Sequence, residues 1–163
     1  MAILKVLTFP DPRLRKVAVP VKKFDKSLEN ITSNMLETMY AEEGIGLAAT
    51  QVDIHERIIV MDLSEERNDP KIFINPEFNI LNDKSLLSFS EGCLSVPGIS
   101  EEIIRPDNIH LSWQDIKGDY HEAEPSGLLT VCIQHEIDHL EGKLMVDYLS
   151  PLKRDRIRKK ASK

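Results

Sequence analysis

Two histidines flank a glutamate in the segment His135-Glu136-Ile137-Asp138-His139. On a helix, positions i and i+4 lie on one face, so both imidazoles can hold a single metal ion. Glu136 follows the first histidine and can reach the open coordination position as a proton carrier. The flanking residues supply an apolar face for burying this helix, which favours a metal site over two surface histidines: Leu128, Leu129, Val131, Cys132, Ile133, Ile137 and Leu140.

A catalytic divalent ion normally takes three protein ligands and leaves a place for water, so a third ligand is needed. Cys132 precedes His135 by three residues, but it lies seven residues from His139, about 10.5 Å along a helix axis. We therefore expect Cys132 to pack in the core. Cys93 is the better candidate, because it follows a strand-like run and lies in the glycine-containing turn Glu91-Gly92-Cys93-Leu94-Ser95.

A third segment, residues 44–51, reads Gly-Ile-Gly-Leu-Ala-Ala-Thr-Gln. It matches the dinucleotide pattern G-x-G-x-x-A, but that pattern has meaning only after a strand and at the start of a helix. Here a helical segment precedes it and a strand soon follows. We expect Gly44 and Gly46 to allow a close backbone approach, and Gln51 to offer an amide donor.

The elements that must position these residues are strands in series with helices at either end. Apolar spacing predicts helices over 27–43 and 126–141, and Ser150-Pro151 predicts the start of a third. Strand patterns cover 57–62, 72–81, 86–90, 101–105 and 109–113. This order predicts an α+β fold in which antiparallel sheets pack around the helix that carries the histidines, with an N-terminal and a C-terminal helix.

Composition and charge place the chain among ordinary globular proteins. It has 163 residues, 41% hydrophobic and 29% charged, with a net charge of −6. We expect one catalytic domain over 1–163, a monomer, no membrane segment, no DNA partner and a reducing cytoplasm for its two cysteines. Residues 153–163 are strongly basic, which predicts either a solvated helix end or a contact with an anionic surface such as the ribosome.

Three motifs together resemble the peptide deformylases, whose signature is G-x-G-x-A-A-x-Q, then E-G-C-x-S, then H-E-x-x-H. All three are complete and in this order, at residues 44–51, 91–95 and 135–139. The resemblance extends over nearly the whole chain, to Gln134, to Leu140-Glu141-Gly142 and to residues 147–152. It is closest to the bacterial type that ends in a helix.

The resemblance implies a hydrolase that removes the formyl group from the N-terminal methionine of nascent peptides and releases formate. Its metal ligands would be Cys93, His135 and His139, with Fe²⁺ favoured and Zn²⁺, Ni²⁺ or Co²⁺ able to take its place. A metal-bound hydroxide would attack the formyl carbon, with Glu136 as general base and then acid. Gln51 and the backbone N–H of Leu94 would stabilise the oxyanion.

The same resemblance implies the substrate contacts. Ile45, Gly46 and Gly92 would hold the peptide backbone, and an apolar pocket for methionine would be lined by Ile45, Leu128, Val131 and Cys132. Without the resemblance, these apolar residues are equally consistent with ordinary core. Glu91 and Arg105 would form a supporting ion pair, treated as a surface pair contributing about 0–1 kcal/mol. Many relatives carry an arginine at the position of Ser100. Its absence here puts in doubt how the protein binds substrate residues that follow the methionine.

Two other functions compete with this interpretation. Zinc endopeptidases share H-E-x-x-H but take a third histidine or glutamate downstream, and Glu141 would lie on a different helix face. A ribosome-associated binding protein with a structural metal would need a fourth protein ligand, and none is suitably spaced. His55, His110 and His121 are expected to be surface or structural histidines.

Overall fold

The computed structural model describes residues 2–161, and these form an α+β structure, as predicted. The α-helices are α1 (Lys26–Ala41), α2 (Leu128–Leu140) and α3 (Pro151–Ala161). Short 3-10 helices are η1 (Pro12–Arg15), η2 (Ala49–Val52) and η3 (Met145–Tyr148). The strands are β1 (Gly46–Ala48), β2 (Ile58–Met61), β3 (Lys71–Ile80), β4 (Leu86–Cys93), β5 (Val96–Pro106), β6 (Ile109–Gln114) and β7 (Tyr120–Ala123).

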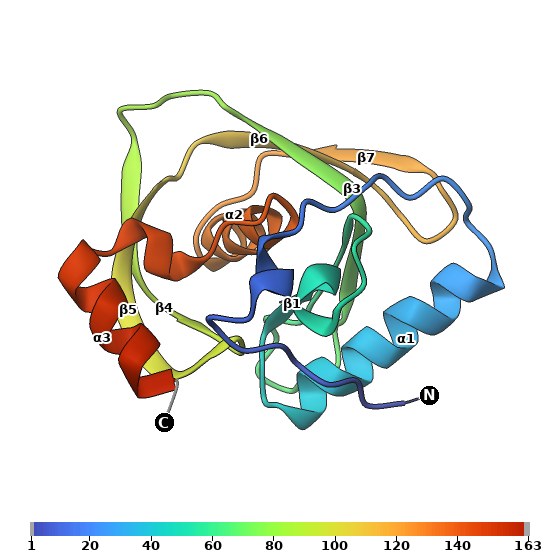
Figure 1. Ribbon diagram of the computed structural model, residues 1–163. Helices are drawn as coiled ribbons and strands as arrows, with labels where there is room; N and C mark the ends of the chain where they lie inside the picture. The colour runs from blue at the N-terminus through green and yellow to red at the C-terminus, as the bar shows by residue number, and fades with distance from the viewer. Residues whose placement is uncertain (1, 162–163) are drawn as a thin grey trace.

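The strands form two antiparallel sheets around α2. The larger has the order β1-β2-β3-β6-β7, and β4 and β5 form a separate two-stranded sheet. Figure 1 shows α2 nearly end-on, with strands around it and α1 on the far side of β1 and β2. Successive β2 residues therefore point to opposite helices: Ile59 packs in one apolar cluster with Ile133 of α2, and Val60 packs in another with Met35 of α1.

The helix boundaries follow the predicted signals closely. The Ser150 hydroxyl accepts a hydrogen bond from the Lys153 N–H at 3.2 Å, which confirms the cap before Pro151. After α2, Gly142 has φ +78°, and a Cβ there would lie 2.5 Å from the Arg15 carbonyl oxygen. Only glycine combines that backbone conformation with so close a neighbour.

The strand predictions were wrong in two respects. Gly92 and Cys93 lie inside β4, not in a turn; the turn falls at residues 94 and 95, and the β4–β5 register shifts between Gly92 and Cys93. A glycine beside such an irregularity lets the strand bend, and that bend orients Cys93. The short strands β1 and β7 were not predicted, because three or four residues carry too little alternation to be recognised.

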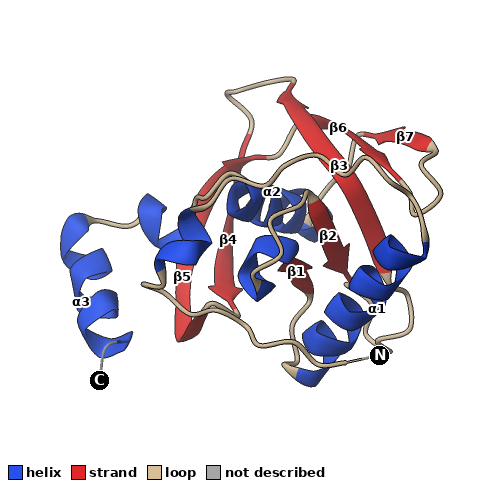
Figure 2. Ribbon diagram, turned by 45° about the vertical axis from the view of Figure 1, so that its right-hand side comes forward, coloured by secondary structure: helices blue, strands red, loops and turns tan. Residues whose placement is uncertain are grey.

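Helix α3 lies at one side of the molecule (Figure 2) and is mostly exposed. Its one buried residue, Ile157, packs in a cluster with Leu7, Phe9 and Leu14 of the N-terminal segment. Lys163 of the basic stretch lies outside the described residues. Within residues 2–161, no helix has the length and apolar character that crossing a bilayer requires.

Candidate active site

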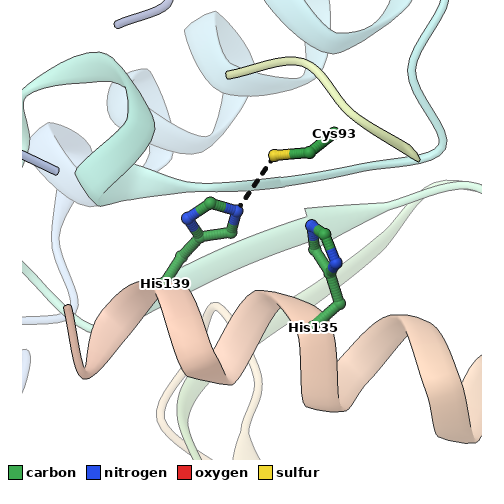
Figure 3. Close-up of side chains that lie close together, drawn as sticks. All are labelled: Cys93, His135 and His139. Atoms are coloured by element: carbon green, nitrogen blue, oxygen red, sulfur yellow. Dashed lines mark hydrogen bonds between the residues drawn. The ribbon is translucent and has the colours of Figure 1, made fainter. Parts of the chain in front are cut away.

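Helix α2 and strand β4 bring together three side chains that can bind a metal. One ligand atom each from Cys93, His135 and His139 lies within 4.8 Å of the others, and no other such group of histidine, cysteine or acidic side chains occurs within residues 2–161. Figure 3 shows both imidazoles rising from one face of α2 toward the cysteine. The Cys93 sulfur is 3.2 Å from Nε2 of His139. The i, i+4 spacing places the two imidazoles on one face of α2, and β4 brings the cysteine to them.

The surroundings prepare both histidines for a cation. Nδ1 of His135 is 3.0 Å from a Glu91 carboxylate oxygen, which fixes the ring and leaves the other nitrogen for an ion. Burial lowers the pKa of His135, but Glu136, Cys93 and Glu91 together raise it well above its ordinary value, and the same negative groups favour a metal cation. Burial holds the pKa of His139 well below its ordinary value, so this ring stays neutral, the form that ligates.

Glu136 follows His135 on α2, is buried, and lines the same pocket as Cys93 and His135. Burial raises its pKa to about 7, and its Oε1 is without a hydrogen-bond partner among the described residues. A Cβ at Gly46 would lie 2.7 Å from Oε2 of Glu136 and 3.1 Å from the Cys132 sulfur. Strand β1 passes so close to α2 that position 46 has no room for a side chain, which explains the glycine. The close approach expected from the sequence occurs here.

Gln51 is fixed in one orientation by three neighbours. The Ala48 N–H donates to its Oε1 at 2.9 Å, and its Nε2 donates to the Ser95 hydroxyl at 3.1 Å and lies 3.6 Å from the Cys93 sulfur. The amide nitrogen therefore faces the ligand cluster. Leu94 follows Cys93, and its Cδ1 would be 2.8 Å from a Cβ at Gly44. Sequence reasoning did not identify Ala48 or Ser95, because neither has side-chain chemistry that stands out.

A buried chain of ion pairs supports His135. Arg105 donates to both oxygens of Glu91 at 2.7 and 2.8 Å, and its third nitrogen donates to Asp138 at 2.9 Å. Tyr148 donates to Asp138 at 2.6 Å, and the guanidinium of Arg105 lies 4.8 Å from its ring centre. The side chains of Arg105 and Glu91 are only 3% and 5% exposed, so the expectation of a surface pair was wrong. Sequence reasoning missed Asp138 and Tyr148.

The cluster opens into a pocket of about 880 Å³. Its wall contains the predicted catalytic and substrate-contacting residues, together with Ser100: Ile45, Gly46, Gln51, Gly92, Leu94, Leu128, Val131, Cys132 and Glu136. Ile45 and Leu128 are 41% and 42% exposed, and both line this pocket. Ser100 pairs with the Ser90 hydroxyl at 2.7 Å across the β4–β5 hairpin.

The remaining sulfur and imidazole groups lie apart from the ligand cluster. Burial raises the pKa of Cys132 well above its ordinary value, so its thiol keeps its proton. His55 and His121 are each 2.8 Å from an aspartate, and His110 is 3.7 Å from a glutamate. Glu141 pairs with Arg57 at 2.7 Å and is not part of the cluster.

Comparison of the sequence with known protein families identifies the family of this chain. The family model described as polypeptide deformylase matches residues 3–155. The chain belongs to the polypeptide deformylase family. Peptide deformylases of Azotobacter vinelandii and Pseudomonas aeruginosa are each 56% identical over 163 residues, which is all of this chain and 96% of each relative.

Solved deformylases share the fold. A peptide deformylase from Legionella pneumophila superimposes with a TM-score of 0.91 at 43% identity, covering 99% of this chain and 94% of that one. The deformylase of Ehrlichia chaffeensis in complex with actinonin gives 0.93 at 40% identity, covering 99% and 97%. The deformylase family is metal-dependent, which agrees with the cluster at Cys93, His135 and His139.

Proposed function

We propose that this chain removes the N-formyl group from the N-terminal methionine of newly made peptides, releasing formate, and that the residues assembled around α2 perform the reaction. The observation that carries the proposal is the position of Glu136. Its carboxylate is buried, its Oε1 has no hydrogen-bond partner within residues 2–161, and it shares with Cys93 and His135 the wall of a pocket large enough for a peptide end.

Cys93, His135 and His139 fit one divalent ion. A thiolate and two imidazoles suit Fe²⁺ or Zn²⁺, and we infer Fe²⁺ in the cell, with Ni²⁺ and Co²⁺ as substitutes. When bound, the ion supplies Lewis acidity, lowering the pKa of a coordinated water toward about 7 and polarising the formyl carbonyl. The structural-metal alternative lacks support, because the cluster within residues 2–161 has three members, whereas a closed structural site takes four protein ligands.

Glu136 would move the proton. It takes a proton from the attacking water and delivers it to the amine nitrogen as the formyl C–N bond breaks, so that formate and a free N-terminus result. The amide of Gln51, held by Ala48 and Ser95, would donate to the oxyanion with the Leu94 N–H. Removing one such donor typically costs about 10²–10³ in rate.

The peptide backbone would pair with the edge of β1. In the ladder order β1 is terminal, and Gly46 pairs with Met61 between hydrogen-bonded positions, so its own N–H and C=O face away from β2. A substrate strand can add there, with Gly92 of β4 on its other side. Ile45, Leu128, Val131 and Cys132 would enclose the methionine side chain.

The setting of the reaction follows from the substrate. We infer that residues 1–163 act as one catalytic domain, as a monomer in the cytoplasm, where formylated nascent chains arise. The exposed basic residues of α3 would contact the ribosome, whose surface is anionic. An endopeptidase is disfavoured because Glu141, its candidate third ligand, is paired with Arg57.

The decisive experiment compares Glu136→Gln with Glu141→Gln, a matched change at the residue that caps the C-terminal end of the same helix. Protein loaded anaerobically with Fe²⁺ is incubated with formyl-Met-Ala-Ser and with a peptide cleavable only at an internal bond. We expect the wild type and Glu141→Gln to release formate and leave the internal bond intact. Glu136→Gln should keep its metal and lose about 10²–10⁴ in turnover. Near-normal turnover of metal-loaded Glu136→Gln would remove Glu136 from the mechanism.

A further inference from the structure

A buried carboxylate that the reaction does not use lies at the end of β2. Asp62 has no exposed surface and accepts four hydrogen bonds: from the Tyr40 hydroxyl at 2.6 Å, the Ser64 hydroxyl at 2.6 Å, the Ser64 N–H at 2.9 Å and the Asp69 N–H at 3.1 Å. Burial raises its pKa, but these donors outweigh burial and leave the pKa well below its ordinary range. Asp62 is thus an ionised centre that orders the segment after β2.

Within that ordered segment, Arg67 adopts a backbone conformation that side chains disfavour. Its φ is +59°, in the left-handed region, where a non-glycine residue persists only if its surroundings hold it there. One guanidinium nitrogen donates to the Asp62 carbonyl oxygen at 2.8 Å, and the other donates to the carbonyl oxygen of Gly44. The guanidinium also lies 5.2 Å from the ring centre of Tyr40. A left-handed backbone conformation and a guanidinium bound through two of its nitrogens thus occur at the same residue.

The contacts of this segment converge on the residues before β1. The Asp62 N–H donates to the Ile45 carbonyl oxygen at 2.9 Å, so the carbonyls of Gly44 and Ile45 are both held by residues 62–67. Gly46 comes next, with its N–H and C=O toward the open edge, and Gly44, Ile45 and Gly46 all line the pocket. Arg67 itself does not line the pocket.

We propose that Arg67 is a positioning residue for substrate: anchored on Asp62, it fixes the Gly44 carbonyl and thereby the angle at which Gly46 presents its backbone to the incoming peptide strand. This inference rests on the proposed function. A strand edge can pair with a peptide only when its N–H and C=O are correctly aimed, since hydrogen bonds weaken steeply with angle. The potential metal ligands and Glu136 lie on β4 and α2, so the chemical step should be spared.

The matched variants are Arg67→Gly, Arg67→Lys and Arg57→Lys. Glycine accepts a positive φ freely, so Arg67→Gly removes the side chain without adding backbone strain. Lysine keeps the charge and one donor group but loses the forked geometry. Arg57 is the control, because its guanidinium also donates to a backbone carbonyl, that of Pro76, at 3.2 Å, yet it lies outside the pocket wall.

Steady-state deformylation of formyl-Met-Ala-Ser by the metal-loaded proteins is the measurement, with thermal unfolding to confirm folding. We expect Arg67→Gly to raise KM about 5–20-fold with kcat within about twofold of the wild type, since a misaimed edge weakens binding before the chemistry. The KM of Arg67→Lys should lie between those of the wild type and Arg67→Gly. Arg57→Lys should keep the wild-type KM. If Arg67→Gly fails to fold, a rise in KM for Arg67→Lys alone carries the test.

Three results would overturn the proposal. The first is a KM within twofold of the wild type in folded Arg67 variants. The second is a loss of kcat at unchanged KM, which would place Arg67 in the chemical step. The third is an equal rise in KM for Arg57→Lys, which would indicate a general effect of loosening the fold. A wild-type enzyme inactive on formyl peptides would instead contradict the proposed function.

Discussion

Helices α2 and α3 carry opposite kinds of side chain in opposite surroundings. Ten of the thirteen residues of α2 are buried, including both histidines and Glu136, whereas α3 buries only Ile157. In α2 the side chains of Gln134, His135 and Asp138 are held by hydrogen bonds to other segments, so a small change there has little room to relax. In α3 the charged groups are mostly solvated. The contrast predicts that effects of substitution fall steeply from the ligand cluster to the C-terminal surface.

The largest effect is expected at Cys93, where β4 meets α2. Cys93→Ala should abolish deformylation and cut metal affinity by more than the roughly 10–100-fold typical of losing an outer hydrogen-bond partner, because a proposed ligand atom itself is removed. Metal content by mass spectrometry and the thiolate-to-cobalt absorption band of Co²⁺-loaded protein measure this.

Cys132→Ala is the matched control for Cys93→Ala, because it deletes the other sulfur on the wall of the same pocket. It should keep one ion per chain and lose about 1–3 kcal/mol of stability from packing. A charge-transfer band that survives the loss of Cys93 and disappears with the loss of Cys132 would reverse the ligand assignment.

The next effect concerns the buried chain behind His135. Arg105→Met leaves the carboxylates of Glu91 and Asp138 without their cation, which should cost about 3–5 kcal/mol in the free energy of unfolding at neutral pH. Chemical denaturation of the metal-free protein measures it. A loss below about 1 kcal/mol in the free energy of unfolding would show that the ion pairs of Arg105 contribute no more than exposed ion pairs do.

The pH dependence of that loss has a definite sign. Burial raises the pKa of Glu91, but Arg105 and His135 outweigh burial and lower the pKa below its ordinary value. In the wild type, ionised Glu91 therefore stabilises the folded state at every pH above the unfolded pKa of about 4.5. This stabilisation is lost as pH falls through the lower, folded pKa. Without Arg105, burial instead favours the protonated carboxyl. The difference between Arg105→Met and the wild type should therefore shrink as pH falls from 7 toward about 4.5.

A smaller effect is expected at Tyr148, the outer end of the same chain. Tyr148→Phe keeps the ring beside Arg105 and removes the hydroxyl that donates to Asp138, which should cost about 1 kcal/mol. Asp138 retains its bond to Arg105, so zinc affinity measured by chelator competition should fall by less than about tenfold. A larger loss of zinc affinity than in Arg105→Met would contradict this order.

The two helices also differ in what their sequences disclose. The spacing of His135 and His139, the apolar flank and the terminal Gly142 are local, and they were sufficient to predict α2 and to place both histidines on one face of it. The chain from Glu91 to Tyr148 was largely missed because it joins β4, β5, α2 and η3 across up to 43 positions, a distance over which spacing has no meaning. Arg67 was missed for the same reason, since its partner Gly44 is 23 residues away.

The smallest effect is expected on the exposed face of α3. Arg156→Gln with Lys160→Gln removes two exposed charges and leaves Ile157 in place, so kcat/KM on small peptides should stay within about twofold and Tm within about 1–2 °C of the wild type. Deleting residues 153–163 is a less clean test of charge, because it also removes the buried Ile157 from its contacts with Leu7 and Phe9. If α3 docks on ribosomes, the double substitution should reduce co-sedimentation, and wild-type binding should weaken with added salt. Salt-insensitive binding that is equal in both proteins would exclude docking through these charges, and it would leave α3 as a helix whose one buried side chain packs against the N-terminal segment.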